Sequence, residues 1–371
     1  MLYANQAGTS WPKPAPVAAA VAGALAAAPE SWNARFDAEH AEVCAAFGVE
    51  DPARLLLTGS ATAALSVAVS DHAWEPGDRV VVSGLEHHAL FRPVQQLSAR
   101  GVEVVVVPRA GTEPLALEVL EVELRRGRVR LVAMTAASNV TGELLPVDSI
   151  VRLARQYGAL SLIDAAQIAG WLPLDLGRLG ADLLAFAGHK GPQAPWGIGA
   201  LYVAPGVTLA SPVAACERPA EGAPGASAPM PGYCDVGSLN RAALAGLAAG
   251  LRWLAEPERT DRLALARKRV AELAAAALDL PGVTLHGPLA AEARMPTLAL
   301  TIAGRSPQEL AAALATRGVI ASAGLQCAPL AHEALGTAPA GVLRLSLGVS
   351  NADGDVGTLC EALRECLKDG P

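Results

Sequence analysis

The residues with the clearest chemical potential lie in the stretch 161–190. Residues 161–163 and 183–186 are short apolar runs that fit buried strands better than helices. Asp164 follows the first run and Lys190 follows the second, and a glycine-rich turn, Gly197-Ile-Gly199, comes next. Charged groups at the ends of buried strands are costly unless they have partners. The stretch therefore predicts a ligand at the carboxyl edge of a parallel sheet.

Pyridoxal phosphate is a ligand that fits these groups. Its aldehyde needs a lysine for a Schiff base, and its pyridine nitrogen needs a carboxylate to remain protonated. Lys190 and Asp164 are the candidates for these two roles. The two residues alone leave another interpretation open, in which Asp164 caps the helix after its strand and Lys190 lies on the surface.

A phosphate site is predicted where the apolar strand around residues 54–57 passes into a helix. The turn Thr58-Gly59-Ser60-Ala61-Thr62 presents hydroxyls and free backbone N–H groups at the positive end of the helix dipole. A plain N-cap by Ser60 would explain the same residues.

Further polar residues follow other predicted strands. His87 comes after the strand at 79–83, where it could stack on a pyridine ring or stand in a solvated loop, and Asn139 follows the strand at 130–134. Ser60, Asp164 and Lys190 also follow strand ends. Because parallel strands bring their carboxyl ends to one edge of a sheet, we expect these five residues to gather there.

Composition favours small-molecule chemistry over nucleic-acid binding. The chain has 371 residues, 52% of them hydrophobic, with a net charge of -7. A basic surface for nucleic acid is not expected, and no apolar run reaches the length of a membrane span. The six cysteines show no C-x-x-C pair, which argues against a zinc site or disulfide framework and favours a reducing cytoplasm. No metal is expected.

Alternating strands and helices predict an α/β protein with two domains. Residues 14–256 are expected to form the large domain around a mostly parallel sheet, with 203–232 as a surface connection. Residues 257–371, together with an extended arm at 1–13, are expected to form a small α/β domain. A capping box at Ser306 predicts the start of one of its helices, and residues 321–329 are expected to form a loop.

Motifs along nearly the whole chain resemble those of class V aminotransferase-fold enzymes, specifically the cysteine desulfurase and selenocysteine lyase branch. They are Ala7-Gly-Thr-Ser-Trp-Pro-Lys-Pro14, Ala61-Thr62, Glu86-His87-His88, Asp164-Ala-Ala-Gln167, Gly188-His189-Lys190, Gly237-Ser238-Leu239-Asn240, Gly324-Leu-Gln-Cys327-Ala-Pro-Leu-Ala-His332 and Arg344-Leu-Ser346. The resemblance implies fold type I of the pyridoxal-phosphate enzymes, with a seven-stranded-type sheet, and a homodimer.

The resemblance also implies roles for individual residues. Lys190 would carry the cofactor, Asp164 would pair with its ring nitrogen, Gln167 would bond its phenolic oxygen and His87 would stack on its ring. The remaining cofactor-binding residues would be Ala61, Thr62 and His189 at the phosphate, Asn139, and Ser238 at the partner subunit's phosphate.

By the same resemblance, Cys327 would separate a desulfurase from an ordinary aminotransferase. Arg344 would hold the substrate carboxylate, with Asn139 beside it, while the freed Lys190 moves the α-proton. The Cys327 thiolate would take sulfur from L-cysteine, which leaves alanine and a persulfide for an acceptor protein that the sequence does not identify. The alternative is that Cys327 is a small apolar loop residue.

Several positions depart from the pattern of relatives. Ala187 replaces a usual Ser or Thr, Ser322 a common arginine, Gln326 a common histidine and Ala63 a common acid, and Asn5-Gln6 stands for Asp-Asn. The segment after Cys216 lacks a Gly-rich run. These changes keep open selenocysteine lyase or another class V C–S lyase or aminotransferase, and also a cofactor-less binding protein.

Overall fold

The larger sheet organises the fold. In the computed structural model, which describes residues 1–209 and 239–368, seven strands run in the order β2-β8-β7-β6-β5-β3-β4. β8 pairs antiparallel with both neighbours, whereas the other neighbouring pairs are parallel. The predicted mostly parallel, seven-stranded-type sheet is confirmed. Its strands are β2 (Leu55–Thr58), β3 (Arg79–Ser83), β4 (Glu103–Val107), β5 (Val129–Thr135), β6 (Leu160–Asp164), β7 (Leu183–Ala187) and β8 (Gly199–Val203).

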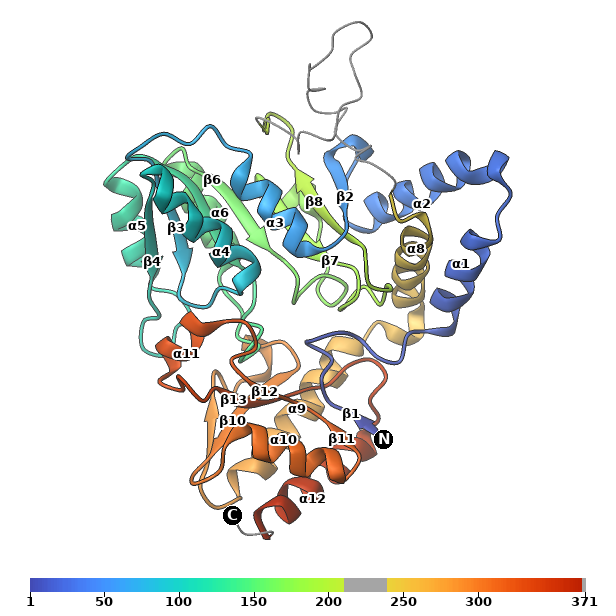
Figure 1. Cartoon of the computed structure of the whole chain (residues 1–371), viewed down its shortest axis with the longest axis vertical. Coiled ribbons are helices and arrows are strands. Elements are labelled where there is room, and N and C mark those ends of the chain that lie inside the picture. Colours follow the sequence, from blue (N-terminus) through green and yellow to red (C-terminus); the bar gives the residue numbers. More distant parts are fainter. Residues whose placement is uncertain (210–238, 369–371) are drawn as a thin grey trace, which may run out of the picture.

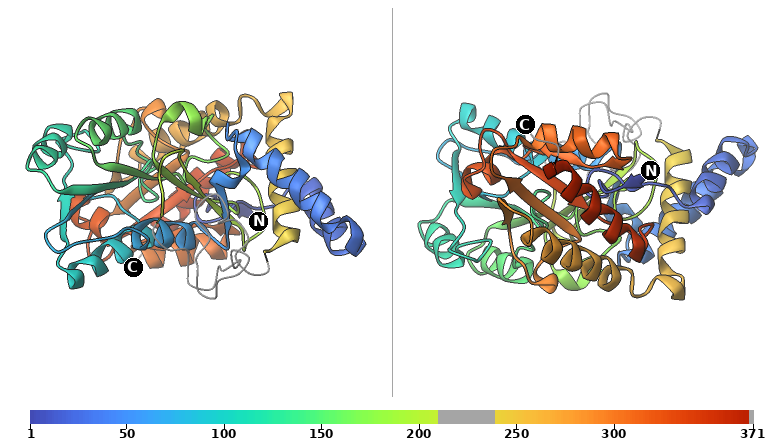
Figure 2. Two further views of the ribbon diagram at one scale, coloured as in Figure 1. Left: turned by 90° about the horizontal axis from the view of Figure 1, so that it is seen from above. Right: turned by 90° about the horizontal axis from the view of Figure 1, so that it is seen from below.

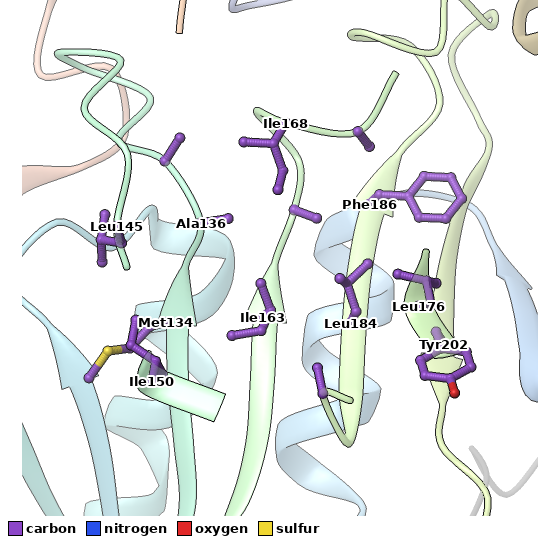
Figure 3. Close-up of a cluster of buried hydrophobic side chains, with 14 of the residues drawn as sticks. Met134, Ala136, Leu145, Ile150, Ile163, Ile168, Leu176, Leu184, Phe186 and Tyr202 are labelled. Carbon is purple, nitrogen blue, oxygen red and sulfur yellow. The ribbon is translucent and has the colours of Figure 1, made fainter. Parts of the chain in front are cut away.

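Successive residues of the central strands enter two different cores, one on each face of the sheet. Met134, Ile163 and Phe186 belong to one cluster (Figure 3), while Leu162 and Ala185 belong to the other. This alternation follows from the two-residue period of a strand. With apolar residues on both faces, the sheet must lie between two helical layers, and Figure 2 shows helices on either side of it.

Eight α-helices belong to this part among the described residues. They are α1 (Ala15–Leu25), α2 (Trp32–Ala46), α3 (Ala61–Ser70), α4 (His88–Gln96), α5 (Leu117–Arg125), α6 (Val147–Gln156), α7 (Leu176–Leu179) and α8 (Arg241–Ala255). No helix among the described residues is long and apolar enough to cross a membrane.

A second, antiparallel sheet lies below the carboxyl edge of the large sheet in the view of Figure 1. Its order is β12-β13-β10-β9, with helices packed on it and the capping box at Ser306 in place. The elements are β9 (Val283–His286), β10 (Thr297–Ile302), β12 (Ser322–Gly324), β13 (Val342–Ser346), α9 (Arg262–Leu278), α10 (Pro307–Thr316), α11 (Pro329–Leu335) and α12 (Asp353–Lys368). The domain boundaries given above stay a prediction.

One expectation for this part is wrong. Residues 321–329 were expected to form a loop throughout, but Ser322–Gly324 is a strand that pairs with β13. Three residues are too short to show a period in the sequence, so their pairing depends on the neighbouring strand.

The N-terminal arm is extended, as predicted, and crosses from the second sheet to the large one (Figure 1). β1 (Leu2–Tyr3) pairs parallel with β11 (Val319–Ile320). Farther along, the Ser10 N–H and the Lys13 ammonium both donate to the carbonyl of His189. The arm therefore joins the two sheets next to the predicted site.

Candidate active site

A cavity of about 390 Å³ opens where the carboxyl edge of the large sheet meets the second sheet and the arm. This volume falls within the range of small-molecule sites, roughly 300–1,000 Å³. It brings together ten predicted site residues, which are Ala61, Thr62, His87, Asn139, Asp164, Gln167, His189, Lys190, Cys327 and Arg344. Ser238, the remaining predicted site residue, lies outside the described residues, as does most of the predicted connection at 203–232.

Asp164 ends β6 in the middle of the sheet and is only 4% exposed. One carboxylate oxygen accepts a hydrogen bond from the N–H of Ala166 at 2.9 Å. Burial raises the pKa of the Asp164 carboxyl, and the Ala166 bond and the charge of Lys190 oppose that rise. Asp164 is thus a buried acid in need of a cationic partner.

Lys190 lies just beyond β7, the next strand of the sheet. Burial lowers the pKa of its ammonium, the charge of Asp164 opposes the change, and Arg344 adds to it. A lysine in this environment loses its proton more readily than a surface lysine and becomes an available nucleophile or base.

His87 caps the N-terminus of α4 with its imidazole ring. Nδ1 accepts a hydrogen bond from the Ala89 N–H at 3.0 Å, so the proton of the neutral ring resides on Nε2. Burial, together with the nearby charge of Lys190, lowers the pKa of His87 to about 4. A neutral ring fixed in this way can stack on a flat aromatic group.

The start of α3 forms one end of the cavity. The Ser60 hydroxyl caps α3 by accepting from the Ala63 N–H, while Ala61 and Thr62, which begin the helix, line the cavity. Gly199 lets the turn approach β8, because a Cβ at Gly199 would lie 2.7 Å from the Ala61 nitrogen. Ser60 is therefore an N-cap, as one interpretation of the sequence predicted. The start of α3 also faces the cavity, where a helix N-terminus can bind an anion.

Two side chains connect this end to the arm. The Gln167 amide donates to the carbonyl of Ala7 at 3.2 Å, and His189 Nδ1 lies 3.1 Å from the Thr9 hydroxyl. Burial lowers the pKa of His189 to about 4, with contributions from the charges of Lys190 and Lys13.

Arg344 lies on β13 opposite Ser322 of β12 and is 4% exposed. Its guanidinium donates to the Asn139 carbonyl at 2.7 Å and to Asn5 Oδ1 at 2.8 Å. Burial lowers the pKa of Arg344 to about 10, so that it stays cationic at neutral pH. A buried cation of this kind is suited to binding a carboxylate.

Cys327 is exposed and lies in the turn between β12 and α11. Gln326 (φ +41°) and Cys327 (φ +58°) both adopt the left-handed conformation, which is strained for residues other than glycine. Two hydrogen bonds fasten the turn to the large sheet: the Cys327 carbonyl accepts from the His88 N–H, and the Gln326 carbonyl accepts from the Asn139 amide. The cysteine is thus held at the cavity rather than on a free loop.

Some residues that line the cavity have no role predicted from the sequence. Asn5 was noted only as a departure from relatives, and Thr135 was not noted at all. The position of Asn5 in an extended arm was the available signal, but its contact with Arg344 joins residues that are 339 positions apart.

A buried acid and a lysine with a lowered pKa meet at the carboxyl edge of a mostly parallel sheet, next to a free helix N-terminus. This is the position at which α/β proteins bind their ligands. Comparison with known proteins is more specific. The Aminotransferase class-V family matches residues 17–359. The chain therefore belongs to the Aminotransferase class-V family, whose members depend on pyridoxal phosphate.

Two of the similar proteins are described as probable cysteine desulfurases. A probable cysteine desulfurase of Pseudomonas aeruginosa is 32% identical over 350 residues, which cover 90% of this chain and 83% of that protein. A probable cysteine desulfurase of Mycolicibacterium paratuberculosis is 33% identical over 81% of this chain and 44% of its own length. The chain thus spans about half the length of that relative, and 48% of a related Mycobacterium leprae protein.

The fold has close counterparts among solved structures. The cysteine desulfurase CsdA of Escherichia coli superposes with a TM-score of 0.86 at 26% identity, covering 99% of this chain and 94% of that chain. The cysteine desulfurase of Thermococcus onnurineus gives a TM-score of 0.88 at 24% identity and confirms the fold.

Proposed function

We propose that this chain is a pyridoxal-phosphate-dependent cysteine desulfurase that converts L-cysteine to L-alanine and leaves a persulfide on Cys327. The observation that carries the proposal is the position of Cys327 at the mouth of the cavity that also contains Lys190, Asp164 and Arg344. The names of the relatives at about 30% identity support it.

The cavity residues fit the cofactor. Asp164 is a buried carboxyl beside a cation, which matches the needs of a protonated ring nitrogen, and the neutral His87 ring can cover the ring. The start of α3, at Ala61 and Thr62, offers N–H groups to the phosphate, with His189 nearby and Gln167 available for the phenolic oxygen. When bound, pyridoxal phosphate supplies an electron sink for the substrate's α-carbon.

Four residues divide the remaining work. Arg344 and Asn139 hold and orient the substrate through its carboxylate, and Lys190, with its lowered pKa, accepts the α-proton. The Cys327 thiolate attacks the substrate sulfur, so that an S–S bond forms while the bond between carbon and sulfur breaks and its electron pair remains with the carbon fragment. Protonation of that fragment gives alanine.

The test is product analysis with purified protein, pyridoxal phosphate and L-cysteine. We expect alanine and a mass increase of one sulfur atom on the peptide that contains Cys327. Cys327→Ala should abolish desulfuration, whereas Cys44→Ala, which removes a buried thiol outside the cavity, should retain it. Unchanged sulfide release by Cys327→Ala would refute the proposal.

A second candidate is a selenocysteine lyase, or another class V C–S lyase or aminotransferase. The observation in its favour is that Ser322 and Gln326, two departures from relatives, both line the cavity near Arg344. A panel of cysteine, selenocysteine and other amino acids, with product identification, separates the two candidates.

We also propose that the chain acts as a cytoplasmic homodimer and that a separate protein accepts the sulfur. Sedimentation of the cofactor-loaded protein tests the dimer. The exposed position of Cys327 supports transfer to a protein, because the persulfide would form at the surface.

A further inference from the structure

The buried arginine of the cavity has only neutral hydrogen-bond partners. Arg344 donates to the Asn139 carbonyl and to Asn5 Oδ1. Among the ion pairs formed within residues 1–209 and 239–368, none includes Arg344. Its Nε is buried and has no partner in that part of the chain. The guanidinium therefore faces the cavity with its charge uncompensated.

An uncompensated buried cation is costly and strongly attracts an anion. The acid that lines the same cavity, Asp164, interacts with Lys190. The two groups that fix Arg344 in its place, the Asn139 backbone carbonyl and the Asn5 amide oxygen, contribute dipoles rather than charges, so the affinity of Arg344 for an incoming anion is preserved.

The backbone around Asn5 is held in place by β13. The residues on either side of Asn5 pair with Ser346 of β13, since the Ser346 N–H donates to Ala4 and the Gln6 N–H donates to Ser346. Gly8 leaves room for the amide, because a Cβ at that position would lie 2.9 Å from Asn5 Oδ1. The arm thus presents one oxygen to the guanidinium from a fixed direction.

We propose that Asn5 is a positioning residue that orients Arg344 for the substrate carboxylate without cancelling its charge. The inference rests on the proposed function only for the nature of the anion, an amino-acid carboxylate. The neutral amide of Asn5 leaves the positive charge of Arg344 available to an anion. Relatives usually have aspartate at this position, so the amide should make Arg344 of this chain the stronger carboxylate binder. An aspartate would form an ion pair with Arg344 and weaken its attraction for the incoming carboxylate, whereas an alanine would release the guanidinium but leave it charged.

The test compares Asn5→Asp and Asn5→Ala with the wild type in the cofactor-loaded protein. L-Alanine is titrated while the visible absorption of the cofactor is followed. We expect Asn5→Asp to raise the dissociation constant by at least about tenfold, because a unit charge is added a few ångströms from the bound carboxylate. Asn5→Ala should raise it less, by a few fold. With L-cysteine, the Asn5→Asp defect should appear mainly in KM.

Asn33→Asp is the matched control. Asn33 Oδ1 also accepts from an arginine, Arg241, at 3.1 Å, but the pair is exposed and does not line the cavity. This variant should bind L-alanine like the wild type. Binding by Asn5→Asp that is as tight as in the wild type, or no weaker than in Asn5→Ala, would overturn the inference. Because the titration needs no desulfuration, a wild type that binds L-alanine but releases no sulfide would refute the desulfurase proposal alone.

Discussion

The two chemically important ends of the cavity are built differently. Asp164 and Lys190 follow buried strands of the large sheet, and burial controls the pKa of both. Cys327 is exposed on a turn of the other sheet and has a strained backbone. A rigid edge suits groups that must keep a cofactor in one place. An exposed turn suits a thiol that must receive sulfur and then give it to another molecule.

Loss of Lys190 should have the largest effect. Lys190→Ala removes the proposed Schiff-base partner and proton acceptor, so desulfuration should fall by roughly 10²- to 10⁴-fold from lost proton transfer alone. The visible colour of the bound cofactor should also disappear on dialysis. Lys268→Ala is the control, because Lys268 lies on α9 with a side chain that is 68% exposed.

Colour that persists in the Lys190→Ala protein would show that another residue carries the cofactor. A wild-type protein that never becomes coloured with pyridoxal phosphate would favour a cofactor-less binding protein. Either result would contradict the proposal that the edge of the large sheet holds a cofactor while the Cys327 turn carries sulfur.

A smaller effect is expected from Asp164→Asn, measured as a pH shift. The charge of Asp164 raises the pKa of Lys190 against the effect of burial, so its removal should lower that pKa further. More neutral amine is then available at low pH. The extent of pyridoxal-phosphate attachment to Lys190 falls as the pH is lowered. In Asp164→Asn, the midpoint of this fall should move to lower pH by about one unit or more, as expected for a close charge pair.

The attachment is measured on cofactor-free protein by borohydride reduction and mass spectrometry of the Lys190 peptide. Asp182→Asn is the control, since Asp182 bonds Ser161 outside the cavity. If the midpoint of the attachment profile in Asp164→Asn stays unchanged or moves to higher pH, the charge of Asp164 does not raise the pKa of Lys190.

Local patterns predicted the large sheet and the position of Asp164 and Lys190 at its carboxyl edge. These two residues were identified because each lies at or shortly after the end of a strand with an apolar pattern, and parallel strands bring such residues to one edge. The resemblance to relatives supplied the roles of Cys327 and Arg344. The contact of Asn5 with Arg344 was not predictable, because it depends on how the arm crosses to β13. The left-handed turn at Gln326 and Cys327 was not predictable either, because neither residue type favours that conformation.

The smallest effect is expected at the turn itself, from Gln326→Gly. Glycine relieves the left-handed strain, worth about 1 kcal/mol, but the Gln326 side chain also donates to the Val342 carbonyl at 3.2 Å, a bond worth about 1 kcal/mol. These contributions oppose each other, so the free energy of unfolding should change by less than about 1 kcal/mol. Without the side-chain anchor, however, the turn should open more often.

Cys327 in the Gln326→Gly protein should therefore react a few fold faster with iodoacetamide, while the cofactor spectrum stays the same. Gln95→Gly, on the exposed surface of α4, is the control for a glutamine-to-glycine change outside the cavity. An altered cofactor spectrum would mean that the turn and the sheet edge form one unit, contrary to the contrast drawn between them. An unchanged alkylation rate would mean that the bonds from His88 and Asn139 are sufficient to hold the thiol in place.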